Sequence, residues 1–242
     1  MTFPLSKSAL ATAVAVLAVA LCGCSSKSDP KPTPTGESSS SSKSRAASQV
    51  CGSLLNGEPA SALERLTDSK HFTESSLTLD EKVRSLSEAK QKLLGNTSFE
   101  HRGKEFDLCL PVATDDLTGG QLTVSAQWIK LRAADHTWKS TNGWTVFDIV
   151  GDGGRDASAP YASAASDTSL LDFRCPVGPG REKNTAISVV IATYKLDRNH
   201  DAQAPEDLTR IAYGAAVKLA QQMNCLTESR LPAALGDLKK VT

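Results

Sequence analysis

The stretch AISVVIATYKL, residues 186–196, decides the fold that the sequence predicts. It is apolar on nearly both faces of an extended chain, as in a central strand that is covered on both sides. Shortly after it, residues 205–225 favour a helix, because the apolar side chains recur at helical spacing and fall on one side: Leu208, Ile211, Ala212, Ala215 and Leu219. A buried strand followed by an amphipathic helix predicts a domain that mixes both element types.

Two turn signals upstream indicate antiparallel pairing. Gly103-Lys104 predicts a hairpin over residues 99–109, and Asn142-Gly143 predicts a second one over residues 138–149, which would place Trp138 opposite Phe147. Residues 122–131 read as a longer strand. These signals predict an α+β fold made mainly of antiparallel sheet with packed helices.

Three further helices are expected in the first half of the chain, and the first is a short one over residues 50–56 that Gly57 ends. Residues 59–66 begin with a proline, which the first turn of a helix tolerates. Thr78 and Glu81 have the spacing of a capping box, and an apolar stripe follows from Leu79 until Gly95. This pattern predicts a helix that begins at residue 79.

A faint repeat suggests an internal duplication. The segment FDLCLPV at 106–112 is echoed by DFRCPV at 172–177. If the echo is a true repeat, residues 49–150 and 169–242 form two related α+β halves, with a loop at 151–168 between them. Chance similarity is the rival interpretation.

The N-terminus has the layout of an export signal. Lys7 precedes an apolar run at residues 9–21, which only Thr12 interrupts. A membrane-spanning helix needs about 20 such residues, so the run is too short to span comfortably. Residues 1–23 are therefore predicted to be a cleaved signal peptide.

The sequence LCGC at residues 21–24 resembles the lipobox of bacterial lipoproteins. Leu21, Gly23 and Cys24 match position by position, whereas Cys22 occupies a slot that usually holds Ala, Ser, Thr, Val or Ile. The resemblance implies that Cys24 receives a diacylglyceryl group and acyl chains such as palmitate. Two acyl chains suffice for stable anchoring. The composition also resembles that of secreted actinobacterial proteins. The export signal and the lipobox together imply that the protein is located at the extracytoplasmic face of the cell membrane.

Residues 24–48 are predicted to be the lipidated cysteine and a disordered tether. Residues 25–48 hold ten serines and three prolines, with no aromatic or large aliphatic side chain. Such a segment cannot bury enough surface to offset the entropy of ordering. A flexible chain of this length would reach about 27 Å.

Four cysteines remain after Cys22 and Cys24: Cys51, Cys109, Cys175 and Cys225. They form no C-x-x-C pair and have no histidine at ligand spacing, so no metal site is expected. Cysteines oxidise outside the membrane, which predicts two disulfides. Joining the helix and the strand of each half selects the pairs Cys51–Cys109 and Cys175–Cys225.

Charge and motifs offer no catalytic centre. The chain has 27 basic and 27 acidic residues, and removal of Lys7 with the signal leaves 26 basic ones, which gives no footprint for nucleic acid. Gly151-Asp152-Gly153-Gly154 lacks a complete phosphate-binding motif. Glu100, Glu105 and Asp107 are expected on an exposed strand face with Arg102. The histidines at 71, 101, 136 and 200 lie in no catalytic motif. The tryptophans at 128, 138 and 144 could form a ligand shelf, but core packing explains them more simply.

We therefore expect a lipid-anchored envelope protein with a binding or scaffolding role, no cofactor and no catalytic residues. Its expected partners are the membrane and an envelope protein or a small ligand. The alternatives are an envelope hydrolase whose site is dispersed in the sequence, and a purely structural surface module.

Overall fold

The centre of the fold is a pair of long antiparallel strands, β4 (Gln121–Lys130) and β8 (Thr185–Tyr194). They pair over their whole length, from Gln121 opposite Tyr194 to Lys130 opposite Thr185. In this computed structural model the described residues are 44–75, 85–96, 104–115, 120–131, 140, 143–150, 159–177, 185–196 and 202–241. The predicted central strand at 186–196 is thus confirmed, since β8 has β4 on one side and β7 on the other.

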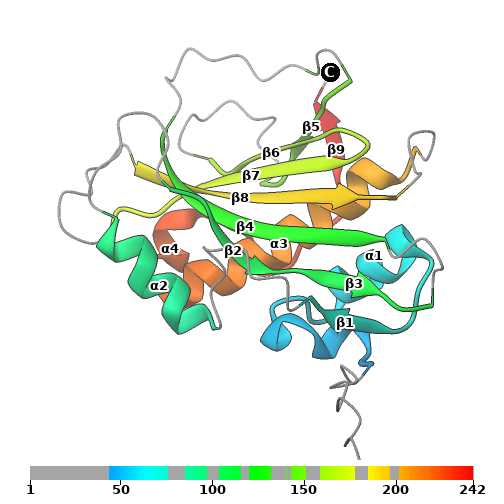
Figure 1. Ribbon diagram of the computed structural model, residues 1–242. Coiled ribbons are helices and arrows are strands. Elements are labelled where there is room, and N and C mark those ends of the chain that lie inside the picture. The colour runs from blue at the N-terminus through cyan, green and yellow to red at the C-terminus, as the bar shows by residue number, and fades with distance from the viewer. Residues whose placement is uncertain are drawn as a thin grey trace, which may run out of the picture. The chain divides into compact units, whose positions relative to one another are not determined.

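The other strands extend this pair into one nine-stranded sheet with the order β1-β3-β4-β8-β7-β6-β5-β9, in which β2 also pairs with β4. The strands are β1 (Phe72–Glu74), β2 (Phe106–Cys109), β3 (Pro111–Ala113), β5 (Thr145–Asp148), β6 (Tyr161–Ala164), β7 (Thr168–Arg174) and β9 (Lys239–Val241). All pairings are antiparallel. The predicted α+β class is confirmed (Figure 1).

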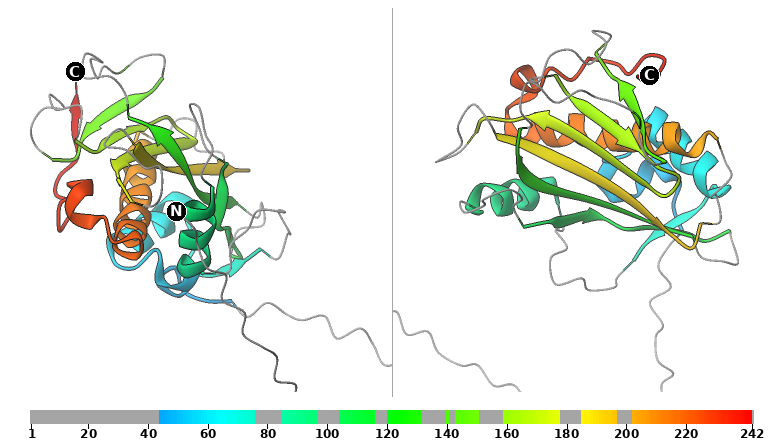
Figure 2. Two further views of the ribbon diagram at one scale, coloured as in Figure 1. Left: turned by 90° about the vertical axis from the view of Figure 1, so that its left-hand side faces the viewer. Right: turned by 90° about the horizontal axis from the view of Figure 1, so that it is seen from above.

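The helices pack against one face of this sheet (Figures 1 and 2). They are the 3-10 helices η1 (Ala47–Gln49) and η2 (Cys51–Ser53) and the α-helices α1 (Glu58–Thr67), α2 (Leu86–Gly95), α3 (Ala204–Met223) and α4 (Leu226–Ser229). The longest of them, α3, contacts β6, β7 and β8. None of the helices in the described ranges combines the length and the apolar character needed to cross a lipid bilayer.

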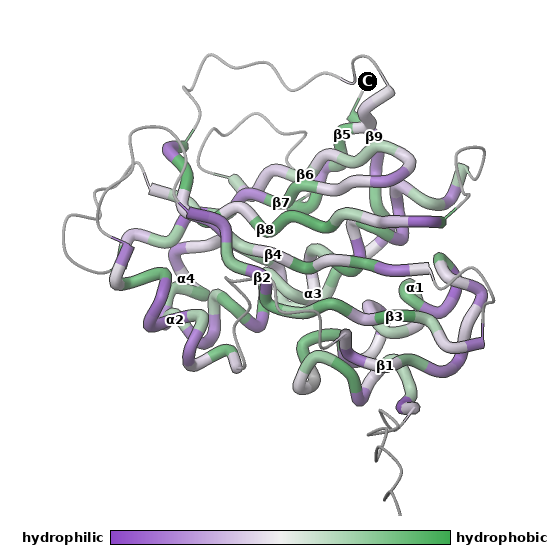
Figure 3. Tube along the Cα trace, viewed as in Figure 1, coloured by the Kyte–Doolittle hydropathy of each residue, from purple (hydrophilic) through white to green (hydrophobic). Residues whose placement is uncertain are grey.

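The core forms where alternate strand residues meet α3. Trp128 of β4, Ile187 of β8 and Phe173 of β7 are fully buried, as are Leu208 and Leu219 of α3. The Trp128 indole N–H donates a hydrogen bond of 2.7 Å to the carbonyl oxygen of Leu93 in α2, which satisfies its polar atom inside the core. Figure 3 shows that β8 is hydrophobic over most of its length, whereas α2 alternates between hydrophobic and hydrophilic segments.

Helices α1 and α3 approach unusually closely at a glycine. A Cβ atom placed on Gly214 of α3 would lie 2.2 Å from Cγ of Pro59 in α1. Real Cβ atoms essentially never come so close to a heavy atom, so only glycine fits here without a shift. The contact brings α1, from the first half of the chain, against the helix that covers the sheet.

Both cysteine pairs lie at disulfide distance. Cys51 of η2 and Cys109 at the end of β2 have a Cα–Cα distance of 5.4 Å, and Cys175 after β7 and Cys225 before α4 have one of 5.3 Å. These are the pairs that the sequence predicts. Strands from both predicted halves nevertheless share one sheet, since β4 of the first half is paired with β8 of the second.

Three sequence predictions fail in detail. The predicted loop at 151–168 contains β6 (Tyr161–Ala164), because these residues pair with both β5 and β7. Helix α2 begins at Leu86 rather than at residue 79, because Ser85 is extended (φ −160°, ψ 160°) and its hydroxyl caps the helix by accepting from the Glu88 N–H. Residues 76–84, with the predicted capping box, lie outside the described ranges. Phe147 pairs with Ala162 of β6 on one side and Lys240 of β9 on the other, so no edge of β5 is left for Trp138.

The contacts of the domain begin ahead of the predicted boundary at residue 49. The Arg45 N–H donates to the Phe72 carbonyl and the Phe72 N–H donates to the Arg45 carbonyl, both at 2.8 Å. Ala47, at the start of η1, is fully buried. The segment that enters the domain therefore adds one bridge to the outer edge of β1.

Candidate functional site

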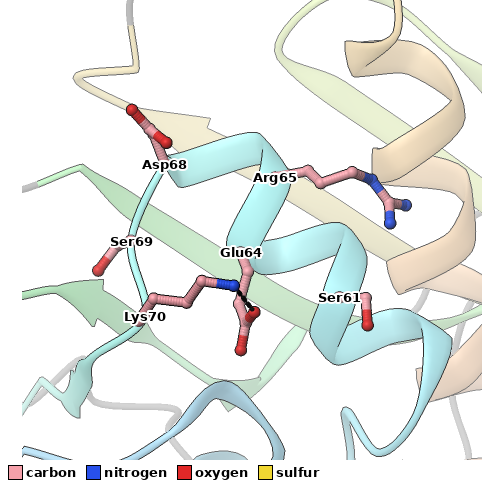
Figure 4. A pocket seen from close by; sticks show the side chains of 6 residues that line it. All are labelled: Ser61, Glu64, Arg65, Asp68, Ser69 and Lys70. Atoms are coloured by element: carbon pink, nitrogen blue, oxygen red, sulfur yellow. Dashed lines mark hydrogen bonds and ion pairs between the residues drawn. The ribbon is translucent and has the colours of Figure 1, made fainter.

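A hollow of about 420 Å³ lies at the C-terminal end of α1. It is lined by six residues of one continuous segment: Ser61, Glu64, Arg65, Asp68, Ser69 and Lys70 (Figure 4). The helix ends here because Asp68 adopts a left-handed conformation (φ 51°) while its N–H still bonds to the carbonyl of Glu64. The chain reverses direction at Asp68, so Ser69 and Lys70 lie beside the helix. The hollow is therefore lined by residues of four charged types: Glu64, Arg65, Asp68 and Lys70.

Arg65 belongs to the hollow by its stem, but its guanidinium points toward α3 (Figure 4). Its Nη2 lies 2.6 Å from Oδ1 of Asp207 and 2.9 Å from Oε1 of Glu58, and its Nε donates to Asp207 at 3.1 Å. The Asp207 side chain is only 4% exposed. Hydrogen bonding to Asp207 raises the pKa of Arg65, although partial burial opposes the shift. The charge of Arg65 is therefore used to join two helices.

Lys70 and Glu64 neutralise each other across the hollow. The Lys70 ammonium lies 2.8 Å from Oε2 of Glu64, and this pair is drawn as a dashed line in Figure 4. The Lys70 side chain is 76% exposed, so solvent screens the pair. The Asp68 carboxylate points away from this pair (Figure 4). The charged groups that meet across the hollow are thus Lys70 and Glu64, which form an ion pair.

A second polar cluster lies next to the hollow, where α1 leads into β1. Asp115 Oδ2 accepts from the backbone N–H of Lys70 at 2.9 Å, from that of His71 at 3.0 Å and from the Ser69 hydroxyl at 3.1 Å. His71 Nδ1 also lies 3.0 Å from this oxygen. The bond from the Lys70 N–H lowers the pKa of Asp115 most, and the bonds to the His71 ring and the Ser69 hydroxyl lower it further. Asp115 therefore fastens the turn between α1 and β1.

Ser69, His71 and Asp115 are the residue types of a catalytic triad, but their order differs. In a triad the imidazole lies between the hydroxyl and the carboxylate, so that it can take the proton of the nucleophile. Here the Ser69 hydroxyl bonds to Asp115 and to the His71 carbonyl oxygen, and the imidazole reaches Asp115 from another side. These hydrogen bonds hold the turn between α1 and β1 in place, and they do not activate the Ser69 hydroxyl as a nucleophile.

A row of polar side chains crosses the sheet on the face opposite to α3. Strand register places Gln127 of β4 beside Ser188 of β8, Ser188 beside Asp172 of β7, and Asp172 beside Tyr161 of β6. Gln127, Ser188 and Asp172 are each buried. Figure 2 (right) looks onto this face, with α1 and α3 behind the strands. The row is a second polar feature, and it is separate from the hollow.

The structure places only some of the residues that the sequence singled out. Trp128 fills the core and Trp144 is half-buried, so the described tryptophans form no exposed shelf. Glu105 accepts a hydrogen bond from Ser125, as part of a strand-to-strand contact. The candidates that lie outside the described ranges are Cys22, Cys24, Glu100, His101, Arg102, His136, Trp138, Gly151 to Gly154 and His200.

Sequence reasoning missed the residues that form the hollow. Asp207 lies in the first turn of α3, where an acidic residue is expected from the helix dipole alone, so nothing in the sequence pointed to Arg65. The described residues contain no group of three His, Cys, Asp or Glu side chains placed to hold a metal ion. Comparisons with protein-family models, with curated proteins and with solved structures found no match to this chain.

Proposed function

We propose that this chain is a lipid-anchored protein of the extracytoplasmic face of the membrane, and that its folded domain is a binding or scaffolding module rather than an enzyme. The observation that carries the proposal is the pair of cysteine bridges. All four cysteines that follow the lipobox lie in disulfide-distance pairs. Disulfide-stabilised domains are typical of oxidising compartments, which agrees with an export signal at the N-terminus.

The entry of the chain into the domain supports an anchored arrangement. Arg45 is hydrogen-bonded in both directions to Phe72, and the Arg45 guanidinium lies 3.9 Å from Glu74. The Cys51 N–H also donates to Glu74, at 2.8 Å, and Cys51 is bridged to Cys109. A pull on the tether would therefore act on a segment that is fixed to the sheet by hydrogen bonds and by a covalent bridge.

The chemistry of the hollow supports binding rather than catalysis. Its basic side chains are engaged, Arg65 by Asp207 and Lys70 by Glu64. Ser69 has its hydroxyl held by Asp115 and by a backbone carbonyl. A surface of fixed, mutually paired charges suits recognition of a polar partner, such as an envelope protein or a small ligand. A serine hydrolase would require the hydroxyl to bond to an imidazole that takes its proton, whereas the Ser69 hydroxyl bonds to the Asp115 carboxylate and to the His71 carbonyl oxygen.

The anchor can be tested in a bacterial host that processes lipoproteins. Cells producing the full chain are fed an alkyne-bearing fatty acid, and the protein is followed in membrane and soluble fractions. We expect the unchanged chain to carry the label in the membrane fraction. Cys24→Ala should carry no label, and acyl chains should no longer hold it in the membrane. Cys22→Ala is the matched control, because it removes the neighbouring thiol, and it should remain labelled. Label that persists in Cys24→Ala, or that disappears in Cys22→Ala, contradicts the proposal.

A further inference from the structure

The end of β8 carries an exposed aromatic residue. The Tyr194 side chain is 63% exposed, and together with Leu226, at 36%, it makes up the exposed large hydrophobic side chains of the described residues. The next residue, Lys195, has a left-handed backbone (φ 60°), and its ammonium lies 5.6 Å from the centroid of the Tyr194 ring. An amphipathic ring beside a long cationic side chain is the combination that favours a membrane–water interface.

Strand register places Tyr194 at the end of the sheet where the chain enters the domain. Tyr194 is opposite Gln121 of β4, Gln121 is opposite Val112 of β3, and Val112 is opposite Thr73 of β1. Phe72, next to Thr73, bonds to Arg45. At about 4.8 Å per strand, the four strand spacings separate Tyr194 from the Arg45 segment by about 19 Å. Figures 1 and 2 show the end of β8 and β1 at the same end of the sheet.

We propose that this end of the sheet, defined by Tyr194, Lys195 and the Arg45–Phe72 bridge, rests on the lipid surface. The inference depends on the proposed anchor at Cys24. The tether that the sequence predicts includes residues 24–43, and a tether of twenty residues has a typical reach of about 25 Å. That reach exceeds the separation of about 19 Å between Tyr194 and the point of entry, so the tether allows the ring and the acyl chains to enter the same bilayer.

The charges at this end select the kind of lipid. Among the described residues, basic side chains of this region are paired with acidic ones: Arg45 lies 3.9 Å from Glu74, and Lys70 lies 2.8 Å from Glu64. The neighbours of Tyr194 on its face of the sheet are uncharged, namely Gln121 on β4 and Ala192 on β8, with Thr168 beside Ala192 on β7. The described residues at this end therefore form no basic patch that would attract anionic headgroups. The contact should form on zwitterionic lipid and should be insensitive to salt.

A distant position provides the control. Cys225, which precedes Leu226, is bridged to Cys175, and Cys175 follows Arg174, which pairs with Ala186 at the other end of β8. Ala186 and Tyr194 are eight residues apart on one strand, which corresponds to about 27 Å. Leu226→Tyr therefore adds a tyrosine at the end of the sheet that would face away from the membrane.

The test is enzymatic iodination of tyrosines by lactoperoxidase, which does not enter bilayers. The full lipidated chain, unchanged or with Leu226→Tyr, is placed in phosphatidylcholine vesicles, and flotation first confirms that it is anchored. Peptide mapping then measures iodination at each tyrosine. The unanchored Cys24→Ala chain without vesicles serves as the reference, in which exposed Tyr194 is the main target. On vesicles we expect iodination of Tyr194 to fall severalfold, while the tyrosine introduced by Leu226→Tyr is still modified.

Three outcomes overturn the inference. Equal iodination of Tyr194 in the floated chain and in the free chain would show that this end does not touch lipid. Protection of Tyr194 in the free chain would indicate self-association. Protection that appears only after soluble cell-wall fragments are added would assign the ring to a saccharide instead. A chain that does not float contradicts the anchor itself, so the two proposals fail separately.

Discussion

Arg65 of α1 and Asp207 of α3 are hydrogen-bonded to each other, although they are 142 residues apart in the sequence. Two guanidinium nitrogens of Arg65 contact Asp207 Oδ1, at 2.6 and 3.1 Å. The Asp207 side chain is almost fully buried, whereas that of Arg65 is 45% exposed. The pair therefore joins α1 to α3 from one edge of their contact, close to the hollow.

Replacing Arg65 by Ala should destabilise the domain by about 1–3 kcal/mol. The substitution removes the fork-shaped donor of a buried carboxylate, and exposure of the Arg65 side chain keeps the expected loss in the lower range for such pairs. Arg65→Lys should recover only part of the loss, because an ammonium cannot reproduce the fork. Urea unfolding followed by circular dichroism measures the three free energies.

Lys70→Ala is the matched control, since it removes a basic residue of the same hollow that pairs with Glu64 at the surface. Its expected effect is below about 1 kcal/mol. If Lys70→Ala destabilised the domain as much as Arg65→Ala, the importance assigned to the pair between the helices would be wrong.

Gly214→Ala should destabilise the domain even though alanine favours helices more than glycine does. The added Cβ would meet Pro59 Cγ at 2.2 Å, and overpacking of this kind costs about 1–3 kcal/mol, against a gain in helix propensity of about 1 kcal/mol. Gly95→Ala is the matched control, because nothing lies within 4 Å of its Cβ position, and it should be neutral or stabilising.

The clash itself is tested by a double variant. Pro59→Ala removes the atom nearest to the new Cβ, so the effect of Gly214→Ala should shrink in that background. Thermal unfolding of the four chains gives the coupling. Additive effects would show that Gly214 is needed for some reason other than its contact with Pro59.

The elements that the sequence predicts well are those whose pattern is local and long. The apolar run around Ile187 predicts β8, because a strand that is buried on both faces is apolar at nearly every position. The stripe that includes Leu208 predicts α3, because a helix that is buried on one side has apolar residues at helical spacing. The strand partners of Phe147 were not predicted. The two edges of β5 are occupied by β6 and β9, and no local turn signal in the sequence indicates these pairings. Cys51 and Cys109 were paired correctly because the strand–helix correspondence supplied the long-range information.

The candidate site was harder to predict than the fold. Arg65 and Asp207 carry ordinary helix-surface residue types, and only the tertiary contact at Gly214 brings them together. Ser69, His71 and Asp115 meet because β1 pairs with β3, which joins the end of α1 to a turn that comes much later in the chain. Long-range charge pairs of this kind leave no periodic signal in the sequence.

Removing either disulfide should lower stability by about 4 kcal/mol, since the two bridges close loops of similar length, with sequence separations of 58 and 50 residues. Replacing Cys175 and Cys225 by Ala should cost more than replacing Cys51 and Cys109. Cys175 and Cys225 are both fully buried, so their loss also leaves a cavity, whereas Cys51 is only partly buried. Urea midpoints of the two double variants give the ranking.

The pairing can be checked by peptide mapping under non-reducing conditions. We expect linked peptides that contain Cys51 with Cys109 and Cys175 with Cys225. A linked peptide that contains Cys51 and Cys225 would contradict both the pairing and the arrangement of the strands beside the helices.

Asp115→Ala should destabilise the domain at neutral pH and have little effect in acid. The carboxylate is hydrogen-bonded to the backbone N–H of Lys70, to the His71 ring and to the Ser69 hydroxyl, and these bonds lower its pKa in the folded state. A group whose pKa is depressed by folding contributes stability above its unfolded value, about 3.9 for Asp, and that contribution is lost as the pH falls through the lower folded value. The urea midpoints of the two chains should therefore differ at pH 7 and converge below about pH 4.

Asp237→Ala, which removes a carboxylate from the exposed C-terminal segment, controls for the loss of one charge. A gap between Asp115→Ala and the unchanged chain that persists undiminished into acid would show that the side chain acts through packing rather than through its charge.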